Sequence, residues 1–163
     1  MAQVVHTQEI AEHIRSLLWN NFQSSLSLIT CQEGDIAFLA AEENFANMLP
    51  AIFMRPAPTD LKPRVLSLNQ EILYRYNIVY IKKVTTSQNV VKVKTQEINS
   101  IAELLFAHRL LPGLTLTNGR IIYCLPTSIN YEPPEDGFLA ARGMADVVAA
   151  SISISVLHYT STF

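Results

Sequence analysis

The sequence predicts the α/β (α+β) class, with a single mixed, mostly antiparallel sheet and two main helices packed on one face of it. Two stretches, at residues 7–21 and 95–105, repeat apolar side chains with the spacing of an amphipathic helix. Other short stretches alternate apolar and polar side chains with the period of a strand. Because 163 residues is an ordinary size for one domain, we expect a single domain over residues 1–163.

The clearest strand lies at the end of the chain, over residues 147–159. Its apolar row of Val148, Ala150, Ile152, Ile154 and Val156 alternates with a row that contains Ser151, Ser153 and Ser155. Successive side chains of a strand point to opposite faces, so we expect the apolar row to face the helices. The serines then lie on the side that the helices leave open, where small side chains let a neighbouring layer or subunit come close.

The chain begins with the helix of residues 7–21, which Thr7 is expected to cap. Residues 26–40 then alternate on either side of a turn at residues 33–35. This pattern predicts a pair of strands, with Phe38 in the second of them.

A proline-rich stretch follows a short buried strand at residues 51–54. Residues 55–68 contain three prolines and no glycine. Because proline lacks a backbone donor, we expect an ordered, irregular loop outside the sheet. Such a loop is either a contact surface or a plain surface loop, and Arg55 and Arg64 are its candidate contact residues.

The middle of the chain contains a second clear strand at residues 72–83, which is partly apolar on both faces and is therefore expected at the centre of the sheet. Residues 90–94 either close a hairpin with it or lead into the helix of residues 95–105. Lys82 and Lys83 end this strand. Such lysines either protect a strand edge from aggregation or dock an acidic partner, and we expect a protein rather than DNA because no aromatic side chains are interleaved with them.

The last third of the chain adds a strand at residues 121–125 before the C-terminal one. Residues 126–146 between these strands show no clear periodicity, and a loop of that length usually has a function. We expect it to contact a neighbouring subunit, with Glu135 and Asp136 as polar participants.

Composition argues against several classes of protein. The formal net charge is −2, which argues against a general basic surface for nucleic acid. Only 16% of residues are charged, which indicates either that partners cover some surface or that the chain is an unusually well-buried monomer. No apolar run approaches the roughly 20 residues that span a bilayer, and the N-terminus lacks the pattern of a signal peptide. Cys31 and Cys124 are isolated in apolar surroundings, which indicates buried thiols rather than a disulfide.

Signatures of catalysis are missing from the sequence. It contains no glycine-rich phosphate loop, no HExxH zinc motif and no GxSxG elbow. Its acidic clusters lie in polar surroundings, which would not separate their pKa values for acid–base chemistry. We therefore expect no catalytic residue, metal or cofactor, and an enzyme is the weaker functional class.

The order of elements is informative where single motifs are not. It comprises the opening amphipathic helix, residues 36–40, an acidic segment, the proline-led residues 49–54, the aromatic strand of residues 74–81, the helix of residues 98–105, the stop at Leu111-Pro112-Gly113 and the final alternating strand. This succession resembles the tail terminator and tail completion proteins of long-tailed bacteriophages, which occupy the neck between head and tail.

The resemblance implies a small mixed α/β subunit without catalysis that assembles with itself into a ring, usually a hexamer, in the virion neck. Such a ring is assembled in the host cytoplasm, ends the tail tube and joins it to the head. The implied partners are the tail tube, a sheath protein and a head-side connector, with DNA only as passing cargo and no membrane. Alternatives are a head–tail adaptor or connector, a cap or binding subunit of a contractile injection apparatus, a cellular adaptor that binds a peptide at a sheet edge, and a small enzyme.

Overall fold

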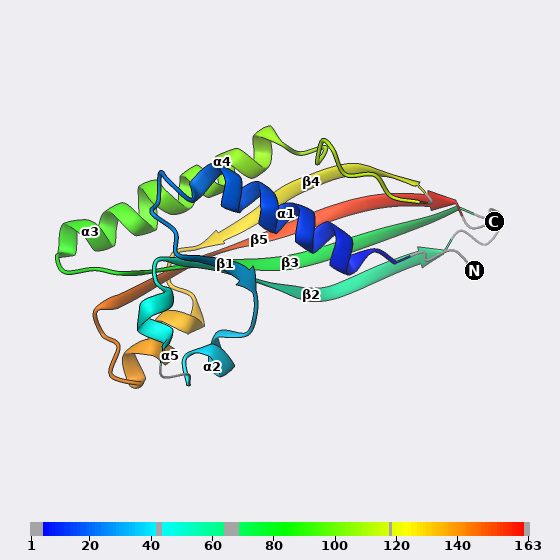
Figure 1. The fold of residues 1–163 in the computed structure, drawn as a ribbon. Coiled ribbons are helices and arrows are strands. Elements are labelled where there is room, and N and C mark those ends of the chain that lie inside the picture. The colour runs from blue at the N-terminus through cyan, green and yellow to red at the C-terminus, as the bar shows by residue number, and fades with distance from the viewer. Residues whose placement is uncertain (1–4, 42–43, 64–68, 118, 162–163) are drawn as a thin grey trace.

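The computed structural model describes residues 5–41, 44–63, 69–117 and 119–161. The helical elements are α1 (Thr7–Phe22), α2 (Ile36–Leu39), the 3-10 turn η1 (Phe45–Met48), α3 (Ser87–Lys92), the π-helical turn η2 (Val93–Glu97), α4 (Ile98–Ala107) and α5 (Pro134–Ala141). The strands are β1 (Thr30–Glu33), β2 (Ala51–Pro63), β3 (Asn69–Lys83), β4 (Gly119–Asn130) and β5 (Val147–Ser161). Helical elements lie on both sides of the strands (Figure 1).

The strands form one five-stranded sheet in the order β1-β2-β3-β5-β4. β1 runs parallel to β2, and the other three pairings are antiparallel. β3 and β5 pair without a register shift from Lys83 opposite Val147 to Asn69 opposite Ser161. The predicted class, a single mixed and mostly antiparallel sheet in an α+β fold, is confirmed.

The main core lies between the sheet and two long helices, α1 and the continuous helix formed by α3, η2 and α4 (Figure 1). β3 contributes the fully buried side chains of Ile72, Tyr74, Tyr76, Ile78 and Tyr80. The apolar row predicted for the last strand, Val148, Ala150, Ile152, Ile154 and Val156, belongs to the same core. Each valine and isoleucine of this row contributes about 1.5 to 3 kcal/mol by leaving water, so the period-two pattern fixes the orientation of β5.

A second, smaller core lies on the opposite face of the sheet, at one end only (Figure 1). Here α2, η1 and α5 cover Phe53, Val79 and Ala149, while Phe45 and Leu139 are their main buried contributions. The remainder of this face has no helix over it within the described chain (Figure 1).

The predicted strand at residues 36–40 is wrong, because these residues form α2. The Asp35 carboxylate accepts a hydrogen bond from the backbone N–H of Ala37 (2.9 Å), which caps the helix. Ile36 is therefore buried, whereas Phe38 is 80% exposed. The first strand of the predicted pair is present only in part, as β1, which begins at Thr30 and extends into the predicted turn, and residues 26–29 are outside any strand.

The predicted proline loop at residues 55–68 is wrong in its first half, because β2 continues to Pro63 and pairs with β3. β1 pairs with only the first four residues of β2, so the rest of β2 is an edge strand, where proline costs no ladder bond on its free side. The pairing of β2 with β3 also shifts its register between Ala57 and Asp60, and this shift accommodates the departure from regular strand geometry. Arg64 lies outside the described residues.

Residues 90–94 lead into the helix and do not form a hairpin. The helix begins at Ser87 rather than near residue 95, because the Thr86 hydroxyl accepts a hydrogen bond from the N–H of Asn89 (3.2 Å). As predicted, its C-terminal part buries Ile98, Ile101, Ala102 and Leu105.

The predicted loop at residues 126–146 is mostly regular structure. β4 runs on to Asn130 beside β5, and α5 begins directly after Pro133. Proline is well suited to the first turn of a helix because the N–H that it lacks has no partner there. The eight residues of α5 were too few to show a helical period.

The start of α1 is held by buried polar side chains rather than by the predicted cap at Thr7. His6 occupies the N-cap position without a side-chain cap bond, and its backbone N–H donates to the hydroxyl of Tyr74 (2.9 Å). The imidazole of His6 lies 5.5 Å from that of His158, which is fully buried.

We expect this histidine pair to make folding sensitive to acid. Burial, and then the neighbouring His6, lower the pKa of His158 from 6.5 to about 4. The unfolded chain therefore binds this proton at a higher pH than the folded chain. The free energy of unfolding should then fall by about 2 to 3 kcal/mol as the pH decreases from 6.5 towards 4.

Urea unfolding followed across this pH range measures the effect. Replacement His158→Phe should flatten the profile, because the titrating group is gone while a buried ring of similar size remains. A variant with the slope of the wild type would contradict the assignment to His158.

Candidate assembly surfaces

The part of the second sheet face beyond α2, η1 and α5 is the first candidate surface, which we call the open face. The strand register places Arg55, Asn77, Ser153 and Ser128 in one row across it, and Ala57, Arg75, Ser155 and Leu125 in the next. Arg75 pairs with Asp60 (2.7 Å) and thereby lowers the pKa of that carboxyl. The positive charge of Arg75 is thus balanced locally, and the open face is mixed in character, because the following row of Leu73, Leu157 and Tyr123 is apolar.

The three predicted serines point away from α1 and α4. Ser153 and Ser155 lie on the open face, and Ser151 lies at its border, opposite Val79 of the second core. The Ser153 hydroxyl donates to the side-chain oxygen of Asn77 on β3 (3.1 Å), and its backbone carbonyl accepts from the Thr127 hydroxyl on β4 (3.1 Å). Ser151 and Ser153 are half-buried, and Ser155 is 9% exposed. Because these side chains are short, they project little from the sheet in the middle of the open face, and a second protein surface can approach the backbone closely there.

Two of the predicted contact residues lie beside each other. The guanidinium of Arg55 on β2 is 3.9 Å from the carboxylate of Glu135 on α5, across the border between the second core and the open face. A pair this long with one half-exposed partner contributes at most about 1 kcal/mol. Arg55 therefore stays available for a contact from outside, whereas the Glu135 side chain is only 18% exposed.

Asp136 has an internal structural role that the sequence did not indicate. Its carboxylate accepts the backbone N–H of Ala149 (3.0 Å) and pairs with Lys94 of η2 (2.6 Å). β4 ends at Asn130 opposite Ser151, so the N–H of Ala149 lies beyond the last strand pairing. Asp136 thus supplies the acceptor for a backbone N–H of β5 that β4 does not reach. Through Lys94 it also connects α5 to the helix on the other face of the sheet.

Lys82 and Lys83 also differ from each other. Lys82 pairs with Glu97 of η2 (3.0 Å), whose second carboxylate oxygen accepts the Tyr80 hydroxyl (2.9 Å). Lys83 pairs with Asp146 (3.3 Å), and both of these side chains are more than half exposed. Lys82 is therefore mainly a structural residue, and Lys83 is the one that is free to meet a partner.

Exposed apolar side chains form a feature that sequence reasoning missed. The most exposed large ones are Ile29, Phe38, Leu61, Val91, Phe106, Leu110, Ile122 and Tyr131. The first three lie on or beside β1 and the outer edge of β2, whereas the last four lie on α4, just after it, or on and just beyond β4. These are the two opposite edges of the sheet.

The sequence contains a pattern from which the exposure of one of these side chains, Phe106, could have been predicted. Phe106 directly follows Leu105, the last member of the buried helical row, and so falls about 100° away from it around the helix. Phe38 gave no such signal, because its segment was read as a strand.

The hollows among the described residues offer little that acid–base catalysis could use. A hollow of about 740 Å³ is a surface depression between α1 and residues 113–115, and it is lined by Glu9, Glu12 and His13 among others. Glu12 is bound to Arg15, which lowers the pKa of Glu12, and Glu9 lies 3.0 Å from the imidazole of His6. Both carboxylates are thus already engaged with neighbours.

Metal and thiol chemistry have little support in the described residues. They include no group of three or more His, Cys, Asp or Glu side chains placed to hold a metal. Burial raises the pKa of Cys31 to about 11, against the smaller effect of nearby Arg15, and burial raises that of Cys124 to about 12. Every helix in the described ranges is too short or too polar to cross a bilayer.

Comparison with known proteins adds one observation. No family model and no curated protein matches this sequence. Among solved structures, a chain of the virion of a native gene transfer agent (GTA) particle is similar, with a TM-score of 0.50 and 9% sequence identity. The two share a fold. The match covers 94% of this chain and 95% of that chain, so it extends over the helices and all parts of the sheet rather than over one motif.

Proposed function

We propose that this chain is a structural, non-enzymatic subunit of a virion or virion-like particle. The observation that supports this most is the fold shared over nearly the full length of both chains with a component of the gene transfer agent virion. Low charge content and the exposed apolar side chains at both sheet edges agree with a subunit whose surface is covered by partners.

Within the particle we assign the chain to the neck, as the resemblance to tail terminator and tail completion proteins implies. One domain would assemble with copies of itself into a ring, a hexamer in the usual case, between the tail tube and a head-side connector. A sheath protein is a further partner in a contractile tail, and DNA passes through the lumen.

The test is assembly of the purified full chain. Light scattering and negative-stain electron microscopy should show closed rings at high concentration or after mixing with tail tubes. A molecular mass that remains that of the monomer under both conditions would contradict the proposal. Rings that bind a head-side connector and leave tail tubes unbound would favour the adaptor alternative.

The open face provides a more specific prediction. Ser153→Lys adds a long cation to its low centre, and we expect loss of assembly on tail tubes with a change in unfolding free energy of about 1 kcal/mol, because one hydrogen bond to Asn77 is removed. Ser24→Lys, in the exposed segment after α1, is the matched control and should assemble normally. Normal assembly of the Ser153 variant would show that the serines are exposed to solvent and do not contact a partner.

A further inference from the structure

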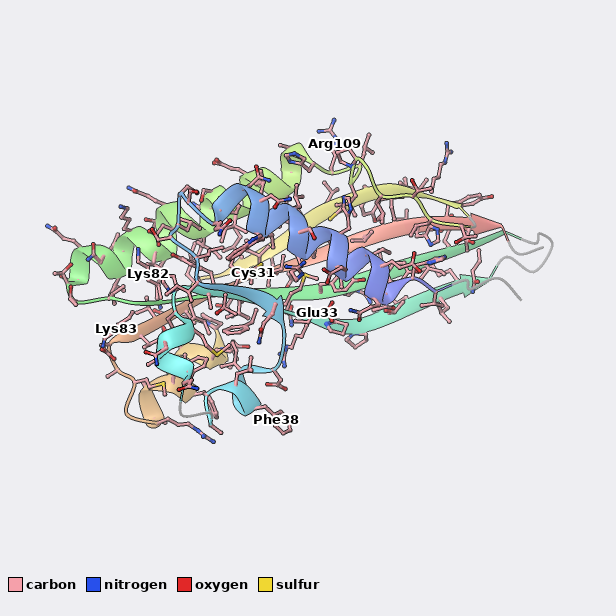
Figure 2. All side chains as sticks on the ribbon, viewed as in Figure 1. Cys31, Glu33, Phe38, Lys82, Lys83 and Arg109 are labelled. Atoms are coloured by element: carbon pink, nitrogen blue, oxygen red, sulfur yellow. The ribbon has the colours of Figure 1, made fainter. Side chains whose placement is uncertain are left out.

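The start of α1 is held on the sheet by few contacts. Among residues 5–9 only the side chain of His6 is buried, the others are half-buried or exposed, and the next buried side chain is that of Ile10. The exposed Gln8 amide donates to Glu33 at the end of β1 (3.2 Å; Figure 2). Because so little apolar surface holds this segment, it can leave the sheet while the rest of α1 stays packed.

His6 attaches the segment to β3 and β5. Its backbone N–H donates to the Tyr74 hydroxyl on β3 (2.9 Å), and that hydroxyl lies 3.5 Å from Nδ1 of His158 on β5. The two imidazoles have their centres 5.5 Å apart and meet edge to face. The Tyr76 hydroxyl adds a hydrogen bond to the carbonyl of Thr7 (2.8 Å). The segment is thus held mainly by polar groups, with the histidine pair at their centre.

This site suits two neutral imidazoles. Nδ1 of His6 lies 3.0 Å from the carboxylate of Glu9, whereas the Nε2 atoms of His6 and His158 are buried and have no hydrogen-bond partner among the described residues. A neutral imidazole has one N–H, but a protonated imidazole has two, and both need an acceptor. A proton on His158 would therefore leave a charged ring buried with an unpaired donor, which is costly.

The groups that face His158 offer no negative charge within the part of the chain that the structure describes. From the start of α1 they are His6 and Glu9, and the Glu9 carboxylate contacts His6 and is 46% exposed. β3 contributes the hydroxyl of Tyr74. β4 contributes Gly119, where a Cβ would lie 2.9 Å from Nε2 of His158. A proton on His158 therefore has no counter-charge in direct contact.

The charged residues of the neighbouring strands lie on the other face of the sheet. Arg120 and Glu71 are both opposite Tyr159 in the strand register, and successive residues of a strand point to opposite faces. His158 is thus separated from both of these charges by the sheet. Burial, and then the neighbouring His6, lower its pKa from 6.5 to about 4.

We propose that the histidine pair is an acid-operated latch, which holds residues 5–9 on the sheet while both rings are neutral and releases them when His158 is protonated. Release brings His158 into water, where both of its N–H groups find acceptors. Because the buried row of α1 begins at Ile10, and β3 pairs with β5 over its whole length, the rest of the fold stays in place. The latch is a property of the fold and does not depend on the proposed function.

Native-state hydrogen exchange of the full chain, followed by NMR, tests the latch. The amide of Ile10 donates to the carbonyl of His6 (3.1 Å) and reports opening at this point. Because the pKa of His158 is about 4 on the sheet and about 6.5 in water, protection of this amide should fall about 100-fold between pH 6.5 and 4, after correction for intrinsic exchange. The amides of β3 should stay at least tenfold better protected. Exchange of the Ile10 amide at the rate of the β3 amides would mean that α1 opens only with the whole molecule, and would overturn the latch.

Two variants assign the effect to one ring. His158→Phe removes the titrating group, so protection of the Ile10 amide should no longer depend on pH. His13→Phe is the matched control, because His13 is a half-buried histidine of the same helix whose ring lies 3.8 Å from where a Cβ at Gly113 would be. It should keep the pH dependence of the wild type. Persistence of that dependence in His158→Phe, or its loss in His13→Phe, would overturn the assignment to His158.

NMR titration of the His158 ring in the wild type needs no variant to fold. The ring should take up its proton with a midpoint between pH 4 and 6.5, and the amide shifts of His6 and Ile10 should change with the same midpoint. A ring that is protonated with no change at these two amides would show that the start of α1 is not coupled to His158, and the latch would be wrong.

Discussion

The variant Gly119→Ala is expected to unfold with a free energy about 3 to 5 kcal/mol lower than the wild type. Gly119 has a φ of +143°, and a Cβ there would lie 2.1 Å from the backbone oxygen of Tyr159 and 2.8 Å from the Cα of Thr160. Both of these atoms belong to the backbone of β5, which pairs with β3 on one side and β4 on the other. The overlap cannot be relieved by a side-chain rotation, so the end of β4 must move away from the sheet.

Gly137→Ala is the matched control. Gly137 lies in α5, and a Cβ at that position meets nothing within 4 Å. Because alanine favours a helix over glycine by about 1 kcal/mol, this variant should be as stable as the wild type or slightly more so. Urea denaturation of the three proteins checks both results. If Gly119→Ala unfolds within about 1 kcal/mol of the wild type, the close approach of β4 to β5 at this point is wrong.

The parts of the fold that could be predicted are those with long periodic patterns. β5 and β3 alternate over more than ten residues each, so a helix would have placed apolar side chains on all sides. α1 and α4 show an apolar row at helical spacing with polar residues opposite. In each of these elements the burial of one face decides the structure, and that information is contained in the local sequence.

Short elements were decided by other interactions. Residues 36–40 alternate like a strand, yet one hydrogen bond from Asp35 to the backbone and the packing of Ile36 are enough to form α2. The prolines of β2 argued against a strand only under the assumption that it had neighbours on both sides. Neither the cap geometry nor the position of a strand in its sheet is contained in a hydrophobic period.

The candidate surface residues were harder to predict because their partners are distant in the sequence. Lys82 and Asp136 look like free surface charges until Glu97 and Lys94 are placed beside them by the fold. Arg55 and Glu135, chosen from separate segments, are adjacent only because the fold brings α5 to the sheet face on which the Arg55 side chain lies. Composition can indicate that charges are present, but only tertiary structure shows which of them remain available to a partner.

Replacement of Glu97, the buried partner of Lys82, is expected to have a second large effect on the free energy of unfolding. Glu97→Ala should lower the free energy of unfolding by about 3 to 4 kcal/mol. The carboxylate of Glu97 is buried and accepts from Tyr80 (2.9 Å) and Lys82 (3.0 Å). Without it, the hydroxyl of the fully buried Tyr80 has no acceptor and the half-buried ammonium of Lys82 has no counter-charge, and both penalties apply only in the folded state.

Three further variants separate these two penalties by urea denaturation. Glu97→Gln keeps an oxygen for Tyr80 and removes the negative charge, so it should be intermediate. Adding Tyr80→Phe to Glu97→Ala removes the unsatisfied hydroxyl and should recover part of the loss. Lys83→Ala removes the adjacent lysine, whose pair with Asp146 is exposed on both sides, and should cost less than about 0.5 kcal/mol. A loss for Glu97→Ala as small as that for Lys83→Ala would mean that Lys82 is held no more firmly than Lys83, and Lys82 would then be as free as its neighbour to contact another subunit.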